Sequence, residues 1–316
     1  MTKFIVELCQ NHGGNKDVLA KMIKSASIAG AEYAKIQSIY SLELTERPEF
    51  EMPSTPSFNY RPYEAELNRL SNLELSIEDH KWFIDQCVSA GITPLTTAFT
   101  KRTLQGISKL QWPVSILKIA SYDSSSYPFI TQASSLFDHL IISTGASYNE
   151  EIAHLNTILS SQSSLQSYTL MHCVTKYPTT IQDGRLLRIP WLKQYSPSVG
   201  FSDHSGRRYP LFLSECAVYL GAEYIERHFT ILPFDETKDG PVSINADELA
   251  SLVEFSDLSK PEQLSYLQRT YGAELLNTAL SYEDGMSTIQ EVAARNYYRG
   301  RFASLTTSGS YDYNWL

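Results

Sequence analysis

The stretch SIAGAEYAKIQ at residues 27–37 leads from the end of a predicted helix, through Gly30, into a predicted strand. The stretch CVSAGITPLTT at residues 87–97 repeats this join around Gly91. Glycine readily takes the left-handed backbone conformation that ends many helices. Two such joins indicate a chain in which helices and strands alternate.

Outward from these two joins, short apolar segments predict eight strands, at residues 4–9, 33–38, 93–99, 116–121, 139–144, 168–174, 198–203 and 223–229. Helical patterns lie between them and after the last, at residues 15–29, 77–90, 101–110, 128–136, 149–160, 185–194, 208–220 and 247–256. The strands are apolar along their length, as in parallel sheets that are covered on both faces. Eight such units over roughly 260 residues predict an α/β fold, the (β/α)8 TIM barrel.

The domain organisation follows from the same pattern. We expect a single barrel domain at residues 1–260 and a short helical or linker extension at residues 261–316, which is too irregular to predict a second domain. The segment 40–75 is long and rich in proline. It predicts an extended loop after the second strand, and long loops at this place in a barrel often cover the active site.

The composition favours a soluble cytoplasmic protein. Hydrophobic residues make up 42% and charged residues 19% of the 316, which is usual for a globular chain. The net charge of -9 argues against a nucleic-acid-binding face. No apolar run approaches the roughly 18 residues of a membrane span, and the N-terminus lacks the pattern of a signal peptide. The four cysteines are scattered without a CxxC pair, so we expect reduced thiols, with Cys9 and Cys173 in the core.

The strand ends are the place to look for chemistry, because the active site of such a barrel lies at the carboxyl ends of its strands. Polar residues lie at or near the carboxyl end of each of the eight predicted strands. Lys35 and Lys118, with serine and threonine hydroxyls nearby, suit a phosphate and a carboxylate because they supply charge and hydrogen-bond donors. His204 and His228, with carboxylates nearby, suit a divalent metal that keeps open positions.

Several of these residues also have a structural interpretation. Serines at strand ends cap helices or close turns without binding any ligand. His172 suits the core as well as a site, and Asn11 and His12 suit a turn. A single histidine at a strand end is more often structural than a metal ligand, whereas two on neighbouring strand ends favour a metal.

Seven segments, taken in chain order, resemble the sialic acid synthase family. They are FIVELCQNHGG (4–14), AKIQS (34–38), LKIAS (117–121), IISTG (141–145), HCVTKYPT (172–179), VGFSDHS (199–205) and IERHFT (225–230) with DGP (239–241). Enzymes of this family condense phosphoenolpyruvate with an N-acyl amino sugar to make nonulosonic acids. The resemblance spans about residues 4–260 and implies the same kind of condensation here.

The resemblance also implies roles for individual residues. It places a divalent metal on His204 and His228, Mn²⁺ by preference and Mg²⁺ or Co²⁺ as alternatives. It places phosphoenolpyruvate on Lys35, Thr97, Lys118, Ser121, Ser143 and Ser202, with Thr175 where the family has an asparagine. The two catalytic carboxylates of the family correspond to Glu7 and Asp123. Tyr177 corresponds to a sugar contact, and we expect Gln37 and Asn11 to contact the sugar as well.

The implied reaction joins C3 of phosphoenolpyruvate to the aldehyde carbon of an open-chain sugar. The metal polarises the aldehyde oxygen, water adds at C2, and phosphate leaves. Either Glu7 or Asp123 acts as the base for the water, and the other acts as the acid.

The chain departs from the family pattern on the sugar side. Family members carry an aspartate after a Gly-Pro pair, whereas Val242 follows Pro241 here. We also expect no C-terminal antifreeze-like domain within the 316 residues. The sequence therefore predicts an altered acceptor, either an aldose or a sugar phosphate, or a separate protein that supplies the domain. A homodimer is expected, as in the family.

Two other functions stay open at this point. One is another phosphoenolpyruvate-dependent barrel enzyme, an octulosonate or heptulosonate phosphate synthase that acts on a phosphorylated aldose. The other is a non-catalytic relative that acts as a scaffold. The scaffold predicts no binding of metal or phosphoenolpyruvate, and the presence of His204, His228, Lys35 and Lys118 argues against it.

Overall fold

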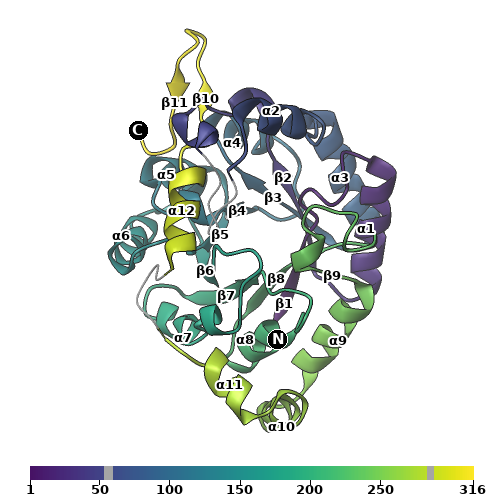
Figure 1. Ribbon diagram of the computed structural model, residues 1–316. Coiled ribbons are helices and arrows are strands. Elements are labelled where there is room, and N and C mark those ends of the chain that lie inside the picture. Colours follow the sequence, from purple (N-terminus) through teal and green to yellow (C-terminus); the bar gives the residue numbers. More distant parts are fainter. Residues whose placement is uncertain (53–59, 283–287) are drawn as a thin grey trace.

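A closed barrel of eight parallel strands forms the centre of the computed structural model, which describes residues 1–52, 60–282 and 288–316 (Figure 1). The strands are β1 (Lys3–Glu7), β2 (Tyr33–Ser38), β3 (Thr93–Ala98), β4 (Ile116–Ile119), β5 (His139–Ser143), β6 (Ser167–Cys173), β7 (Ser198–Asp203) and β8 (Tyr224–Phe229). Each strand pairs with the next in chain order, and β8 pairs with β1. A short strand, β9 (Ser243–Ile244), extends the sheet beside β8. The predicted (β/α)8 barrel is confirmed.

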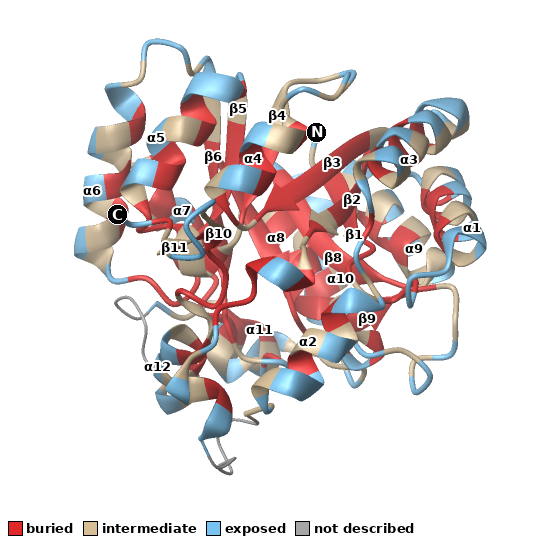
Figure 2. Cartoon of the chain, turned by 90° about the horizontal axis from the view of Figure 1, so that it is seen from above, coloured by how far each residue is buried: buried red, intermediate tan, exposed pale blue. Residues whose placement is uncertain are grey.

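Helices follow the strands and surround the barrel. They are α1 (Lys16–Ile28), α2 (Tyr63–Ser71), α3 (Ile77–Ala90), α4 (Lys101–Ile107), α5 (Tyr127–Leu136), α6 (Asn149–Ser160), α7 (Arg188–Leu192), α8 (Phe212–Tyr219) and α9 (Ala246–Asp257). Strand ends agree with the predicted ones within two residues, but α7 and α8 begin later than predicted. Pro210 disfavours helical backbone in the residue before it, and Arg185 takes a left-handed conformation with φ 45°. Figure 2 shows the buried strands inside and the exposed outer faces of the helices.

The interior of the barrel follows the two-residue period of a strand. One layer inside it is apolar and consists of Ile5, Tyr33, Leu95, Ile141, Met171 and Tyr224. Two residues further along the same strands the side chains are Glu7, Lys35, Thr97, Ser143, Cys173 and Glu226. The apolar layer thus forms the floor beneath a second, mostly polar layer at the carboxyl ends. The outward-facing residues pack against the helices in the main core.

The C-terminal part of the chain returns to the barrel. It contains α10 (Lys260–Tyr271), α11 (Ala273–Ala279), α12 (Ile289–Tyr298) and a hairpin of β10 (Ser304–Leu305) and β11 (Tyr311–Asp312). Arg295 of α12 forms an ion pair with Glu151 of α6, and the two helices lie near one another in Figure 1. A domain boundary at residue 260 stays a prediction.

The long segment after β2 meets this returning chain. It contains two short 3-10 helices, η1 (Ser41–Glu43) and η2 (Pro48–Glu51), and then α2. The backbone of Thr45 donates to Arg301 at 2.9 Å, and that of Ala303 donates to Glu43 at 3.0 Å. A small second core holds the two segments together, and it consists of Leu44, Phe50, Leu70, Tyr297 and Phe302. Residues 53–59 of the predicted loop lie outside the described residues. In the described parts of the chain no helix has the length and apolar character of a membrane span.

Candidate active site

A cavity of about 720 Å³ opens at the carboxyl ends of the strands. Every residue that the sequence proposes for the site, except Asn11, lines it: Glu7, Lys35, Gln37, Thr97, Lys118, Ser121, Asp123, Ser143, Thr175, Tyr177, Ser202, His204 and His228. They are far apart in sequence, and the closing of the barrel brings them together. The placement agrees with the rule that barrel strands present their functional side chains at this end.

Asn11 has a different place. Its amide nitrogen donates to the carbonyl of Phe229 and to Ser243 Oγ, both at 2.9 Å. Its amide oxygen accepts from the backbone nitrogen of Asp239 at 3.3 Å. Asn11 is buried and ties the loop after β1 to the segment after β8. A structural role for Asn11, which the sequence leaves open, agrees with these contacts.

Two buried lysines share one buried carboxylate at the centre of the polar layer. Glu226 Oε2 lies 3.7 Å from Lys35 Nζ, and Glu226 Oε1 lies 3.5 Å from Lys118 Nζ. Ser202 Oγ donates to Glu226 Oε1 at 3.0 Å. Burial acts to raise the pKa of Glu226, but Lys118, Lys35 and Ser202 outweigh it and lower that pKa below its usual value. The carboxylate is therefore charged and balances part of the lysine charge.

The lysines have further contacts around the cavity. Lys35 contacts the Glu7 carboxylate and donates to Thr97 Oγ1 at 3.1 Å. Lys118 donates to Ser143 Oγ at 2.7 Å. Burial lowers the pKa of Lys35 to about 8, and the charge of Lys118 adds to this effect. A desolvated pair of cations with hydroxyls beside it can hold an anion with several oxygens.

The two histidines are positioned by their sequence neighbours. Asp203 precedes His204, Arg227 precedes His228, and the side chains of Asp203 and Arg227 form a fully buried ion pair. Asp203 also accepts from Ser214 of α8 at 2.5 Å. Because alternate residues of a strand face opposite sides, this pair anchors the ends of β7 and β8 outside the barrel while the histidines face the cavity.

The histidine rings lie close together inside the cavity. Their centroids are 5.4 Å apart, and the Tyr177 ring lies 4.1 Å from that of His204. Burial lowers the pKa of both histidines, and for His204 the charge of His228 lowers it further. Both imidazoles are consequently neutral near pH 7, which is the form that binds metals.

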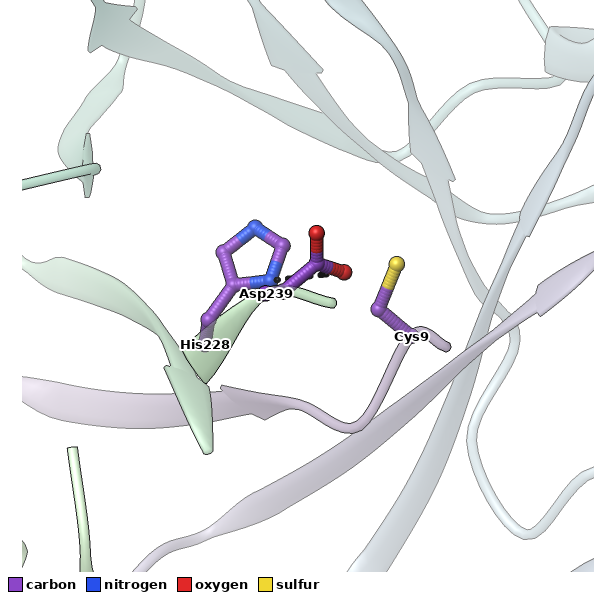
Figure 3. A group of neighbouring side chains, drawn as sticks. All are labelled: Cys9, His228 and Asp239. Carbon is purple, nitrogen blue, oxygen red and sulfur yellow. Dashed lines mark ion pairs between the residues drawn. The ribbon is translucent and has the colours of Figure 1, made fainter. Parts of the chain in front are cut away.

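Cys9 and Asp239 lie close to His228 and form with it a group of potential metal ligands (Figure 3). One ligand atom each from Cys9, His228 and Asp239 lies within 4.8 Å of the other two. His228 Nδ1 and Asp239 Oδ2 are buried and have no hydrogen-bond partner among the described residues. These donors fit a divalent cation, because buried polar atoms normally have partners. The expectation that Cys9 belongs to the core alone is incomplete, since its side chain lines the cavity.

Asp123, which the sequence proposes with Glu7 as a catalytic carboxylate, has contacts suited to proton transfer. It accepts from Asn314 Nδ2 at 2.9 Å and from Ser126 Oγ at 3.0 Å. Burial raises the pKa of Asp123 to about 6, although both hydrogen bonds and Arg299 act to lower it. A carboxyl group of this kind exchanges a proton near neutral pH.

Sequence reasoning missed the residues that line the outer part of the cavity. Arg61, Lys238 and Arg301 are cationic and line it. Glu66, which is fully buried, forms ion pairs with Arg61, Arg69 and Arg301, so one carboxylate serves three guanidinium groups. No short motif signals this cluster, because its members come from the loop after β2, α2 and the chain after α12.

Comparisons with known proteins identify the family of the chain and several relatives. The NeuB family matches residues 22–261. The chain is 27% identical over 314 residues to the N,N'-diacetyllegionaminic acid synthase of Campylobacter jejuni, covering 96% of this chain and 88% of the relative. It is 28% identical over 304 residues to the N-acetylneuraminate-9-phosphate synthase of Drosophila melanogaster, covering 92% and 78%. The crystal structure of N-acetylneuraminic acid synthetase from Leptospira borgpetersenii superposes with a TM-score of 0.69 at 25% identity, covering 86% and 93%.

Proposed function

The chain belongs to the NeuB family, and from this premise we propose that it condenses phosphoenolpyruvate with an aldose, an N-acylated hexosamine or a related sugar, to give a nonulosonic acid and phosphate. It is then a carbon–carbon bond-forming transferase of nonulosonic acid and polysaccharide biosynthesis. The observation that carries the proposal is the buried group of Lys35, Lys118 and Glu226 beside two neutral histidines. The relatives, which are named as nonulosonic acid synthases, support the same chemistry.

The donor end of the cavity suits phosphoenolpyruvate. Lys35 and Lys118 supply positive charge for its phosphate and carboxylate. The hydroxyls of Thr97, Ser121, Ser143, Thr175 and Ser202 line the same space and supply donors. Glu226 holds both lysines in place until the anion arrives, since its carboxylate lies within 3.7 Å of each lysine nitrogen, and its charge acts to raise the pKa of Lys35.

The acceptor end is proposed to hold the open-chain sugar against Tyr177 and Gln37. His204 and His228 are the proposed ligands of a divalent ion, Mn²⁺ by family preference and Mg²⁺ or Co²⁺ as alternatives; when bound, the ion supplies a Lewis acid for the aldehyde oxygen. C3 of phosphoenolpyruvate bonds to the aldehyde carbon, water adds at C2, and the C2–oxygen bond to phosphate then breaks.

Two carboxyl groups are available for the proton transfers. The raised pKa of Asp123, about 6, makes its protonated form accessible near neutral pH. Glu7 contacts the Lys35 ammonium, which favours a charged carboxylate. Asp123 is therefore proposed as the acid that protonates the new alkoxide, and Glu7 as the base that takes a proton from the water.

Phosphate release tests this function directly. Protein, phosphoenolpyruvate and Mn²⁺ are mixed with N-acetylmannosamine, mannose, diacetamido hexoses and sugar phosphates in turn. We expect release that requires one sugar and is lost in His204→Ala. His154→Ala is the matched control, because His154 is exposed on α6 and does not line the cavity. No release with any sugar would contradict the proposed synthase.

A second candidate is a synthase for phosphorylated aldoses. The observation that favours it is the set of cations at the outer cavity, Arg61, Lys238 and Arg301, since a phosphate ester on the sugar would meet them. The same panel separates the two candidates, because each sugar is offered with and without its phosphate. The scaffold alternative predicts that calorimetry detects no phosphoenolpyruvate binding.

The cellular setting and assembly stay predictions. We propose a cytoplasmic enzyme, in line with four cysteines that are all unpaired thiols. We further propose a homodimer, with a separate antifreeze-like protein as the alternative partner. Light scattering of the purified chain at several concentrations tests the homodimer. A protein that is monomeric at every concentration would contradict it.

A further inference from the structure

We infer that Cys9 and Asp239 join His228 as direct ligands of the divalent ion, which makes the site one for a thiolate-binding metal such as Zn²⁺, Fe²⁺ or Co²⁺. The inference rests on the proposed function only for what the ion does in catalysis, not for its binding. It differs from a site made by His204 and His228 alone, because it adds a sulfur and a carboxylate ligand and changes the class of ion.

Three separate segments bring the ligands together. Cys9 follows β1, His228 lies near the end of β8, and Asp239 precedes the 3-10 helix η5 (Gly240–Val242). Figure 3 shows the thiol, the carboxylate and the imidazole grouped on one side of the strand ends. The three ligand atoms all lie within 4.8 Å of one another. β1 and β8 are hydrogen-bonded neighbours in the closed barrel, so this proximity is a direct result of the fold.

The spacing suits a small metal ion. A tetrahedral site with metal–ligand bonds of about 2.0–2.3 Å has edges of about 3.3–3.8 Å. His228 Nδ1 and Asp239 Oδ2 are 3.7 Å apart, which is too far for a hydrogen bond but correct for one edge of such a site. The Cys9 sulfur lies within 4.8 Å of both atoms, so a thiol that moves toward them completes the group.

Burial supplies an independent reason for a ligand at this point. His228 Nδ1 and Asp239 Oδ2 are both buried, and within the described ranges neither has a hydrogen-bond partner. Leaving two such atoms unpaired is unfavourable, because each loses its hydrogen bonds to water on burial. One cation would satisfy both.

The thiol is also held in place. Cys9 has a left-handed backbone with φ 39°, which is uncommon for a residue other than glycine. Its backbone nitrogen donates to Glu7 Oε1 at 2.7 Å, and this hydrogen bond supports the turn. The side chain lines the cavity, as the inward positions of Ile5 and Glu7 on β1 predict for residue 9.

The donor set determines which ions bind well. Thiolate ligands favour Zn²⁺ and related transition metals, whereas Mg²⁺ and Mn²⁺ prefer oxygen ligands. Metal binding forms the sulfur–metal bond and releases the thiol proton to water. With His204, the other proposed ligand, these donors would make four, and an open position on the ion, as in catalytic zinc sites, would admit the aldehyde oxygen.

His204, the other proposed metal ligand, lies beside this group, with its ring centroid 5.4 Å from that of His228. Its Nδ1 lies 3.8 Å from Cys173 Sγ, so the cavity contains two cysteines, each near one histidine. Among the residues that the structure describes, only the Cys9 thiol has a carboxylate and an imidazole together around it. Cys173 therefore offers a matched control for any experiment on Cys9.

Cobalt absorption tests the inference without substrate. The full chain is stripped of metal and titrated with Co²⁺ while the near-ultraviolet thiolate-to-cobalt charge-transfer band is recorded. We expect the band in the unmodified protein and in Cys173→Ser, and no band in Cys9→Ser. A band that persists in Cys9→Ser, a band lost only in Cys173→Ser, or no band and no cobalt binding would each overturn the inference.

Circular dichroism shows whether Cys9→Ser folds. If it does not, a second variant tests the same site. Asp239→Asn keeps the size of the side chain and removes its charge, and we expect at least about a tenfold loss of Zn²⁺ affinity. Unchanged affinity in this variant would remove Asp239 from the site and overturn the three-ligand arrangement. Since neither measurement needs phosphoenolpyruvate or sugar, a protein that shows the band yet releases no phosphate would contradict the proposed function and leave this metal site intact.

Discussion

In Glu226→Gln, the affinity for phosphoenolpyruvate should begin to fall at a lower pH than in the unmodified protein. Binding to Lys35 needs its ammonium form. Burial has already lowered the pKa of Lys35 to about 8, and Glu226 is the main group that opposes this. The affinity should therefore be high below about pH 8 and fall above it in the unmodified protein. Without the Glu226 charge, the pKa of Lys35 falls further, so the loss of affinity begins at a lower pH.

The size of the shift follows from the geometry. Lys35 Nζ and Glu226 Oε2 are 3.7 Å apart, and with an effective dielectric constant of about 20 two unit charges at that distance interact by about 4.5 kcal/mol. At about 1.4 kcal/mol per pKa unit, this energy corresponds to about 3 units. Glu7 still contacts the same ammonium in the variant and limits the change. We expect a shift of about 1–3 units.

Calorimetric titration of phosphoenolpyruvate into chelator-treated protein over a series of pH values measures this shift, because no metal-bound group then titrates near the ligand. The second ionisation of the ligand's phosphate, at about pH 6, is common to both proteins and cancels in the comparison. Glu236→Gln is the control: it makes the same chemical change at an exposed residue between β8 and β9 and should leave the profile as it is. If Glu226→Gln and the unmodified protein lose affinity at the same pH, the charge of Glu226 does not determine the pKa of Lys35, and the reasoning is refuted.

Three further outcomes follow from the same site. Arg227→Met should lower the free energy of unfolding in urea by about 3–5 kcal/mol, because it leaves the Asp203 charge buried without its partner. Asn314→Ala removes a hydrogen bond to the charged form of Asp123, so it should raise the pKa of that carboxyl by about one unit and move the alkaline limb of the pH–rate profile, which reports the proposed acid, to higher pH. Chelation of the divalent ion should abolish phosphate release but keep the increase in thermal stability caused by phosphoenolpyruvate, since Lys35 and the hydroxyls still hold it.

The regular part of the fold and the donor end of the site could be predicted from sequence. Eight short apolar strands that alternate with helices predict a (β/α)8 barrel. In this fold the active site lies at the carboxyl ends of the strands. Lys35 and Lys118 are conspicuous because lysine is rarely buried without a partner. The structure places both in the polar layer, with Glu226 between them.

Other parts of the site depend on contacts that no local pattern encodes. The sequence places Cys9 in the core, because it follows an apolar strand, but it lines the cavity. Its grouping with Asp239, which comes from a distant loop, is not visible in the residues near Cys9. Arg301 reaches the cavity because the chain after α12 pairs with the segment after β2. Nothing in the residues near 301 indicates that pairing, since it depends on a small apolar core shared with Phe50 and Leu70.

The short motifs at β7 and β8 show why some functional residues are recognisable from sequence. His204 needs an anchor that faces away from the cavity, and the strand period places that anchor at the adjacent residue, Asp203. The same applies to His228 and Arg227, and the two anchors bind each other. A site residue and its support are then neighbours in the chain, so both appear in one motif. Asp239, which approaches His228 from a separate loop, has its support at Asn11, more than two hundred residues away, and the pattern near Asp239 alone does not reveal its role.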